Sequence, residues 1–313
     1  MNRKIKFRRS RQRASKLGEG AYGCVISPAT MCDGSENPDY VAKYFGDRVH
    51  AYKEIDEYMV MKRVDPNGDF SIRLKEHCGS NKITQNETDF VNQECSTVNN
   101  PSNKLIIEMG GDELSYYPLK SIDKEDAFKE LLTVFLPIFE GLVTLKSQRV
   151  AHSDIKPANI VVKNDKAKLI DYGLATTFDK ILTEDFYETT NYWFWPKDLA
   201  IMNSANPREA RDMFFDRQVK KSILNPFALS EKEAAEIMNY GKKHREKVAE
   251  TWDTYNLGVT IFYYLGNNNF RGMVFSQWPT ASRTLIGMMV HPNVRSRSQP
   301  EKVLSWVKRY LRI

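Results

Sequence analysis

The chain has 313 residues, of which 41% are hydrophobic and 27% charged, and its formal net charge is +6. This is the composition of an ordinary globular protein, so it excludes collagen-like, coiled-coil and wholly disordered chains. It also excludes a membrane span, because the longest apolar stretch, residues 131–143, is interrupted by Thr133, Pro137 and Glu140.

The first sixteen residues form a basic arm. Eight lysines and arginines precede the first acidic residue, Glu19, so the rest of the chain carries 6 − 8 = −2. The arm is either a solvated tail or a contact to an anionic partner, nucleic acid or a membrane surface. Because the arm lacks the apolar core of a secretion signal, we expect a cytoplasmic or nuclear protein (in a host cell or virion if viral) that is not secreted.

The four cysteines predict reduced thiols. They form no C-x-x-C pair, and four are too few for a disulfide framework in a chain of this length. They are Cys24, Cys32, Cys78 and Cys95.

The N-terminal third alternates strand and turn patterns. A glycine-rich segment, residues 18–23, runs into a strand, and a second strand is expected at 40–45. Apolar spacing predicts a helix over 51–64, which Pro66-Asn67-Gly68 ends. Further strands are expected at 70–74 and 105–107. The polar residues 79–103 between them are interpreted as an inserted loop.

The later part of the chain has mainly helical patterns. Asp123 is the expected N-cap of a helix that continues to about Ser147 with a kink at Pro137. A hairpin is predicted around Asn164-Asp165. Further helices are expected over 231–247, 252–265 and 300–313. Strands first and helices later indicate an α+β protein with a small β-rich lobe ahead of a helical lobe.

Three glycines, Gly18, Gly20 and Gly23, fit a turn that lies over phosphates, since a strand and not a helix follows them. Lys43, in an apolar strand, then becomes a candidate phosphate ligand that needs a carboxylate partner. Glu54 and Glu57 lie one turn apart on the following helix. We favour Glu57, because Val60, Met61 and Val64 follow it at the spacing of a packed helix.

The segment 150–160 contains the richest chemistry. Asp154 can accept a hydroxyl proton, and Lys156 can neutralise a phosphoryl group in transfer. Asn159 and Asp171 are oxygen ligands of the kind that Mg²⁺ prefers when it is bound together with phosphates. Mg²⁺ bound together with phosphates is therefore the expected cofactor.

These motifs together resemble those of the eukaryotic-type protein kinases. GEGAYGCV, YVAK, HSDIKPAN, DYG, the D-T-Y-N-L-G helix and H-P-N-V-R follow one another in family order across residues 17–295. The resemblance implies a two-lobed protein-kinase-like fold. A small β-rich N-lobe with one main helix would span 17–109, with the insert at 79–103. A larger helical C-lobe would span 110–313, with a helical insert at about 198–250.

The resemblance also implies roles for individual residues. Asp154 would be the catalytic base beside Lys156, with Asn159 and Asp171 as metal ligands. ATP would be the co-substrate, and Lys43 would hold its α- and β-phosphates and be fixed by Glu57. Glu108 and Met109 would read adenine through backbone groups. The remaining nucleotide contacts would come from the glycine-rich segment: Leu17, Gly18, Glu19, Gly20, Ala21, Tyr22, Gly23 and Val25.

Serine/threonine specificity is indicated by Lys156 and by Thr190. Ser153 replaces the arginine that in the family receives an activation-loop phosphate, so we expect activity without that phosphorylation. Trp195-Pro196-Lys197 replaces A-P-E, and Asp198 is expected to pair with Arg295 instead. The short hinge and the inserts resemble divergent kinases of large DNA viruses.

Three other functions remain open on the sequence. A catalytically inactive scaffold could bind partners through the inserts. A small-molecule kinase of the aminoglycoside type shares part of the motif set, although Lys156 and the complete glycine pattern argue against it. A nucleic-acid-binding role of the arm could coexist with catalysis. The substrate cannot be read from the sequence.

Overall fold

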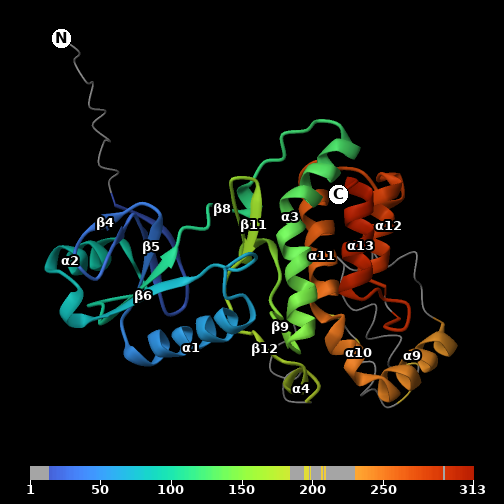
Figure 1. Cartoon of the computed structure of the whole chain (residues 1–313), viewed down its shortest axis with the longest axis horizontal. Coiled ribbons are helices and arrows are strands. Elements are labelled where there is room, and N and C mark those ends of the chain that lie inside the picture. Colours follow the sequence, from blue (N-terminus) through green and yellow to red (C-terminus); the bar gives the residue numbers. More distant parts are fainter. Residues whose placement is uncertain are drawn as a thin grey trace, which may run out of the picture. The chain divides into compact units, whose positions relative to one another are not determined.

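A computed structural model describes residues 14–183, 194–196, 198, 206, 208, 230–291 and 293–313 (Figure 1). These residues form two compact units. The first unit contains the described residues up to Met59 together with Ile72–Met109. The second contains Val60–Ser71 and the described residues from Gly110 to Ile313. Compared with the expected lobes, 17–109 and 110–313, the structure assigns Val60–Ser71 to the second unit.

The first unit is built on a five-stranded antiparallel sheet with the order β1-β2-β5-β7-β6. A two-stranded ribbon of β3 (Ala29–Thr30) and β4 (Glu36–Asn37) follows β2. Helix α1 (Arg48–Val64) follows β5, as expected. The strands of the sheet are β1 (Ser15–Glu19), β2 (Cys24–Ser27), β5 (Tyr40–Phe45), β6 (Leu74–Gly79) and β7 (Asn103–Glu108).

Successive side chains of strand β5 point to opposite faces of the sheet. Ala42 and Tyr44 point to one face, where they join a buried cluster that includes Ile106 of β7 and Val91 of the insert. Lys43 lies between them in the sequence and therefore points to the opposite face. It pairs in register with Val25 of β2 and Leu105 of β7. The insert thus covers the face of the sheet that Lys43 does not occupy.

The insert, residues 79–103, is not the loop that its polar composition predicted. It contains helix α2 (Gln85–Glu94), which begins with a capping box between Thr84 and Glu87. Glu87 also accepts hydrogen bonds from Lys104 Nζ and Tyr44 Oη, both at 2.6 Å. The polar residues of the insert therefore cap helix α2 and attach it to the sheet.

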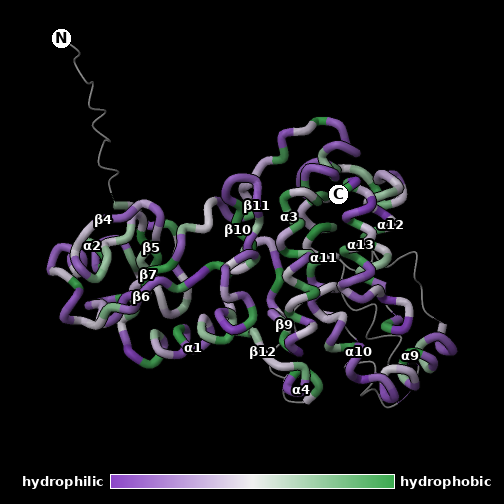
Figure 2. The backbone as a smooth tube through the Cα atoms, viewed as in Figure 1, coloured by the Kyte–Doolittle hydropathy of each residue, from purple (hydrophilic) through white to green (hydrophobic). Residues whose placement is uncertain are grey.

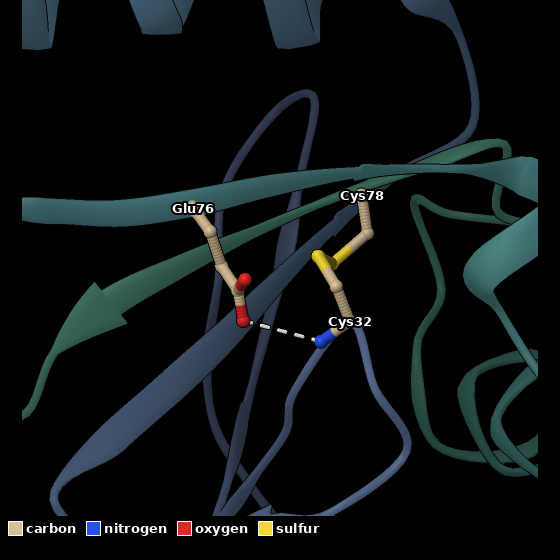
Figure 3. A group of neighbouring side chains, drawn as sticks. All are labelled: Cys32, Glu76 and Cys78. Carbon is tan, nitrogen blue, oxygen red and sulfur yellow. Dashed lines mark hydrogen bonds between the residues drawn. A yellow bond between two sulfur atoms is a disulfide. The ribbon is translucent and has the colours of Figure 1, made fainter.

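All four cysteines are paired, so the expectation of reduced thiols was wrong. Cys24 is bonded to Cys95 and Cys32 to Cys78. In Figure 3, Glu76 lies beside the second disulfide and accepts a hydrogen bond from the backbone N–H of Cys32 at 3.2 Å. The partners are 71 and 46 residues apart in the sequence, which is why no short motif marked them. The predicted cytoplasmic or nuclear location loses the support of free thiols and stays a prediction.

The second unit is mainly helical. Helix α3 (Lys124–Ser147) begins as expected at Asp123, whose carboxylate accepts from the N–H groups of Glu125 and Asp126 at 2.8 and 3.0 Å. Pro137 lies inside this helix. The other helices are α4 (Phe178–Ile181), α9 (Glu231–Lys243), α10 (Arg245–Glu250), α11 (Trp252–Asn267), α12 (Thr280–Met289) and α13 (Pro300–Leu311).

The short strands of the second unit carry the chemically interesting loops. The predicted hairpin is present as β10 (Ile160–Lys163) and β11 (Lys166–Leu169), and β8 (Asp112–Glu113) pairs with β10. Its turn residues, Asn164 and Asp165, have φ values of 53° and 57°, which such a two-residue turn requires. A second ribbon pairs β9 (Val150–Ala151) with β12 (Thr176–Thr177).

Buried apolar side chains hold the second unit together. Figure 2 shows hydrophobic residues recurring along α3 and α11. Helix α3 packs against α13 and β11, and α11 packs against α12. Trp195 and Trp252 are fully buried and meet edge to face, with ring centroids 5.4 Å apart. The expected α+β class is confirmed.

Two predicted regions lie largely outside the described residues. The basic arm is described only from residue 14, so its predicted anionic partner stays a prediction. Of the predicted insert 198–250, only residues 198, 206, 208 and the part from Ser230 onward are described, and Thr190 is not among them. Among the described residues, no helix is long and apolar enough to cross a membrane.

Candidate active site

The glycine-rich loop, residues 18–23, joins β1 to β2 in the first unit. The N–H of Gly20 donates to the carbonyl of Gly23 at 2.8 Å and closes the turn. A Cβ atom on Gly23 would lie 2.8 Å from the Cε of Lys43, so a side chain there would displace this lysine. Leu17 and Tyr22 are exposed at 55% and 59%. At Gly18 and Gly20 no side chain covers the backbone, as a phosphate-binding turn requires.

Lys43 forms its ion pair with Glu54 and not with Glu57, which corrects our prediction. The Nζ of Lys43 lies 2.5 Å from Oε2 of Glu54, and both side chains are largely shielded from solvent. Glu54 lies three residues after Ala51 and four before Tyr58, which are both buried on α1. It thus belongs to the inward-facing stripe of the helix. Glu57 lies one turn further on, and the spacing of the apolar residues alone could not decide which glutamate pairs with Lys43.

The predicted hinge residues, Glu108 and Met109, have occupied backbone N–H groups. The N–H of Glu108 donates to the carbonyl of Arg73 at 3.0 Å, and that of Met109 to the carbonyl of Asp39 at 2.9 Å. Neither of these two N–H groups is therefore a candidate adenine donor in this conformation.

In the second unit, the loop that follows β9 is held by a buried carboxylate. Asp253 of α11 accepts from the backbone N–H groups of His152 at 2.7 Å and Ser153 at 2.9 Å. Burial raises the pKa of Asp253 to about 6. Ser153 has a φ of 64°, a conformation that costs free energy in a residue other than glycine. The two hydrogen bonds offset that cost and fix the backbone just before Asp154.

His152 stabilises the same loop as a neutral ring. Burial lowers its pKa to about 4. Its Nε2 lies 3.2 Å from the carbonyl oxygen of Ile170, so this nitrogen carries the proton, and its Nδ1 accepts from the N–H of Asp154 at 3.3 Å. The ring thereby connects the loop at 152–154 to the end of the β10–β11 hairpin.

Asp154 is 5% exposed, and its two carboxylate oxygens differ. Oδ2 accepts from the Nζ of Lys156 at 3.0 Å and from the Nδ2 of Asn159 at 2.6 Å. Oδ1 has no hydrogen-bond partner among the described residues. Burial raises the pKa of this carboxyl group, while the hydrogen bond from Lys156 lowers it. One oxygen is thus fixed and the other is left to accept a proton.

Asn159 and Asp171 lie on neighbouring segments. The carbonyl of Asn159 accepts from the N–H of Ile170 at 3.0 Å, directly before Asp171. Asp171 is exposed and has a φ of 63°. Tyr172, which follows it, is buried, and its hydroxyl donates to the carbonyl of Leu169 at 2.8 Å. The structure therefore brings four predicted residues into one region: Asp154, Lys156, Asn159 and Asp171.

Trp195 and Asp198 make contacts near this region that the sequence did not reveal. The indole N–H of Trp195 donates to the carbonyl of Ser153 at 2.6 Å. Asp198 pairs with Arg297 at 2.8 Å, and both side chains are buried. The expected partner, Arg295, was wrong, because the buried guanidinium of Arg297 points inward, where its Nε also donates to the carbonyl of His291 at 3.1 Å. It stacks over the ring of Tyr255 at 4.8 Å.

Comparison with known proteins identifies the family. The protein kinase domain model matches residues 11–305. A mitogen-activated protein kinase kinase, mkk2, of Aspergillus fumigatus is 26% identical over 191 residues, which cover 59% of this chain and 34% of the relative. The stress-activated protein kinase JNK of Suberites domuncula is 27% identical over 191 residues, 60% of this chain and 47% of the relative.

A putative serine/threonine-protein kinase of Acanthamoeba polyphaga mimivirus is 25% identical over 116 residues, 33% of this chain and 18% of the relative. The matches span less than half the length of each of these three relatives. The chain belongs to the protein kinase family, which confirms the resemblance drawn from its motifs. A viral origin stays a prediction.

Proposed function

We propose that this member of the protein kinase family transfers the γ-phosphate of ATP to serine or threonine hydroxyls of proteins. Asp154 accepts the proton of the attacking hydroxyl. Lys156 offsets negative charge on the phosphoryl group as it transfers. Lys43, oriented by Glu54, and the backbone of the glycine-rich loop bind the phosphates of the nucleotide.

The asymmetry of the Asp154 carboxylate carries this proposal. A buried carboxylate that has lost its water must be satisfied by hydrogen bonds or by ligands. Lys156 and Asn159 satisfy Oδ2 alone. Oδ1 lacks a partner among the described residues, so a substrate hydroxyl that donates to it would complete the set. The raised pKa of the carboxyl group favours its action as a proton acceptor.

The donor set in this region fits Mg²⁺. Asn159 and Asp171 offer amide and carboxylate oxygens, the hard ligands that this ion prefers. The Nδ2 of Asn159 donates to the carbonyl and the Oδ2 of Asp154 at 3.0 and 2.6 Å, which orients its amide and leaves the Oδ1 oxygen for a cation. When bound, Mg²⁺ would neutralise charge on the phosphates. Asn159 and Asp171 would hold it.

Transfer of labelled phosphate from ATP with Mg²⁺ to a basic protein such as histone tests the proposal. We expect label on serine and threonine, and a fall of about 10²-fold or more in kcat for Asp154→Asn, because this substitution removes the proton acceptor. The matched control is Asp69→Asn, an exposed aspartate of the same unit, which should keep the native rate. Absence of transfer by a native chain that binds ATP would instead favour the scaffold function. Label on a small-molecule substrate but on no protein would favour the small-molecule kinase.

A further inference from the structure

The insert at 79–103 reaches the glycine-rich loop of its own unit. Its last part, Cys95–Thr97, follows helix α2 and runs beside the turn between β1 and β2. The disulfide between Cys24 and Cys95 joins the two segments covalently, with the Cα atoms 6.2 Å apart. Cys24 directly follows Gly23, so the disulfide is attached to the first residue after the glycine-rich loop.

Glu19, inside the loop, is held by the same segment. Its Oε1 accepts from the backbone N–H of Ser96 at 2.6 Å and from that of Thr97 at 2.5 Å. The hydroxyl of Thr97 lies 2.8 Å from the same oxygen and 3.0 Å from the carbonyl of Gly20, so its single proton serves one or the other. The hydrogen bonds from the N–H and the hydroxyl of Thr97 lower the pKa of Glu19 to about 2, so the carboxylate is charged.

Lys16 adds a third link ahead of the loop. Its ammonium group donates to the carbonyl of Glu94 at 2.6 Å and to the carboxylate of Glu19 at 3.2 Å. Although it was counted with the basic arm, this lysine therefore connects β1 to the C-terminal end of α2. The loop is thus tied to the insert at residues 16, 19, 20 and 24, on both sides of its turn.

The insert can act as an anchor because it is itself fixed. Glu87 of α2 accepts from Lys104 of β7 and from Tyr44 of β5, which directly follows Lys43. Lys104 is fully buried and Glu87 is 9% exposed, so this pair is shielded from water and cannot move apart without leaving an unpaired buried charge. Val91 and Val98 pack into the same apolar cluster as Ala42 and Tyr44. The insert is therefore packed against the sheet by a buried ion pair and an apolar cluster.

The glycine-rich loop has little packing of its own to hold it. Gly18 has open space around its Cα, Gly20 meets only a backbone oxygen of its own turn, and residues 20–22 are exposed. Glycine residues also leave the backbone free to adopt many conformations. Two sets of contacts restrict the loop: those with residues 94–97, and the ring of Tyr22, which stacks on the ring of His50 in α1 with centroids 3.8 Å apart.

We propose that Thr97 is a positioning residue that, with Cys95 and Ser96, holds the glycine-rich loop in its nucleotide-binding conformation and so sets the affinity for ATP. The inference rests on the proposed function only in taking ATP as the ligand of the loop. The clamp between insert and loop is a property of the protein without nucleotide. Preorganisation of this kind raises affinity because less conformational entropy is lost when the ligand binds.

The test compares Thr97→Val, which keeps the shape but loses the hydroxyl, with Thr97→Ser, which keeps the hydroxyl. The control is Thr88→Val, the same change at a residue of α2. Among the described residues, Thr88 makes no hydrogen bond to the glycine-rich loop. Hydrogen–deuterium exchange of residues 18–24 is measured without nucleotide and without reductant, so that the disulfides persist. The Kd for ATP with Mg²⁺, the KM for ATP, the KM for a protein substrate and kcat are then determined.

We expect Thr97→Val to speed exchange in the loop and to raise both the Kd and the KM for ATP by about tenfold, the effect of losing one hydrogen bond to a charged group. The KM for the protein substrate should stay near its native value. Thr97→Ser and Thr88→Val should behave like the native chain. Unchanged exchange in Thr97→Val would overturn the clamp, and faster exchange with unchanged ATP affinity would overturn its role in binding. Faster exchange in a chain whose native form binds no ATP would uphold the clamp and refute the proposed function instead.

Discussion

Asp253 makes the stability of the second unit depend on pH in a way that can be calculated. Its carboxyl group has a pKa of about 6 in the folded protein because it is buried, against 3.8 for an exposed aspartate. The folded state therefore binds the proton more tightly than the unfolded state. The stabilisation from this proton is fully present below pH 3.8 and is lost as the pH rises through 6. At 1.36 kcal/mol per pKa unit, the free energy of unfolding should lose about 2 kcal/mol between pH 4 and pH 7.

Asp253→Asn removes this titration while keeping the shape of the side chain. An amide can still accept from one of the two N–H groups, those of His152 and Ser153, but leaves the other without an acceptor. This produces an offset in stability that does not vary with pH. The difference in unfolding free energy, native minus variant, should therefore fall by about 2 kcal/mol from pH 4 to pH 7.

Urea unfolding followed by tryptophan fluorescence measures this difference. All five tryptophans lie after residue 190, in the sequence of the second unit, so the signal reports on the unit that contains Asp253. Asp69→Asn, at an exposed position of the same unit, should track the native chain at every pH. Parallel native and Asp253→Asn profiles, with one constant offset from pH 4 to pH 7, would refute the reasoning.

Three further predictions concern single contacts. Glu54→Gln should lower kcat/KM about tenfold or more in a phosphate-transfer assay, because a charge-assisted hydrogen bond to Lys43 is lost. Glu57→Gln should have a smaller effect. If Glu57→Gln had the larger effect, Glu57 would be restored as the partner of Lys43. Asp198→Asn should lower the free energy of unfolding of the second unit, measured in urea, by about 3–5 kcal/mol, because Arg297 stays buried without its carboxylate. The control Asp179→Asn, at an exposed position, should change this free energy little. Equal effects of the two variants would argue against the buried pair. Tyr172→Phe should lower the free energy of unfolding by about 1 kcal/mol, because the hydrogen bond to the carbonyl of Leu169 is lost, and should leave phosphate transfer intact. A loss of activity without a loss of stability would show that the hydroxyl acts in catalysis.

Features that depend on neighbouring residues could be predicted from the sequence. Asp123 caps α3 through N–H groups two and three residues away, and the turn at Asn164-Asp165 closes a hairpin between adjacent strands. The same holds for the order of the kinase motifs and for the α+β class. Hydrogen bonds and side-chain periodicity over a few residues determine these features, so the local sequence contains the information.

Pairings between distant segments were decided only by the tertiary structure. Glu54 and Glu57 share one face of α1, and the packing of the part of that helix that belongs to the first unit brings Glu54 to Lys43. Arg297 meets Asp198 across 99 residues because the chain turns after α12. The cysteines pair, and Thr97 reaches Glu19, because the sheet brings strands from different parts of the sequence together. Such contacts depend on where whole elements pack, and residue spacing along the chain does not contain that information.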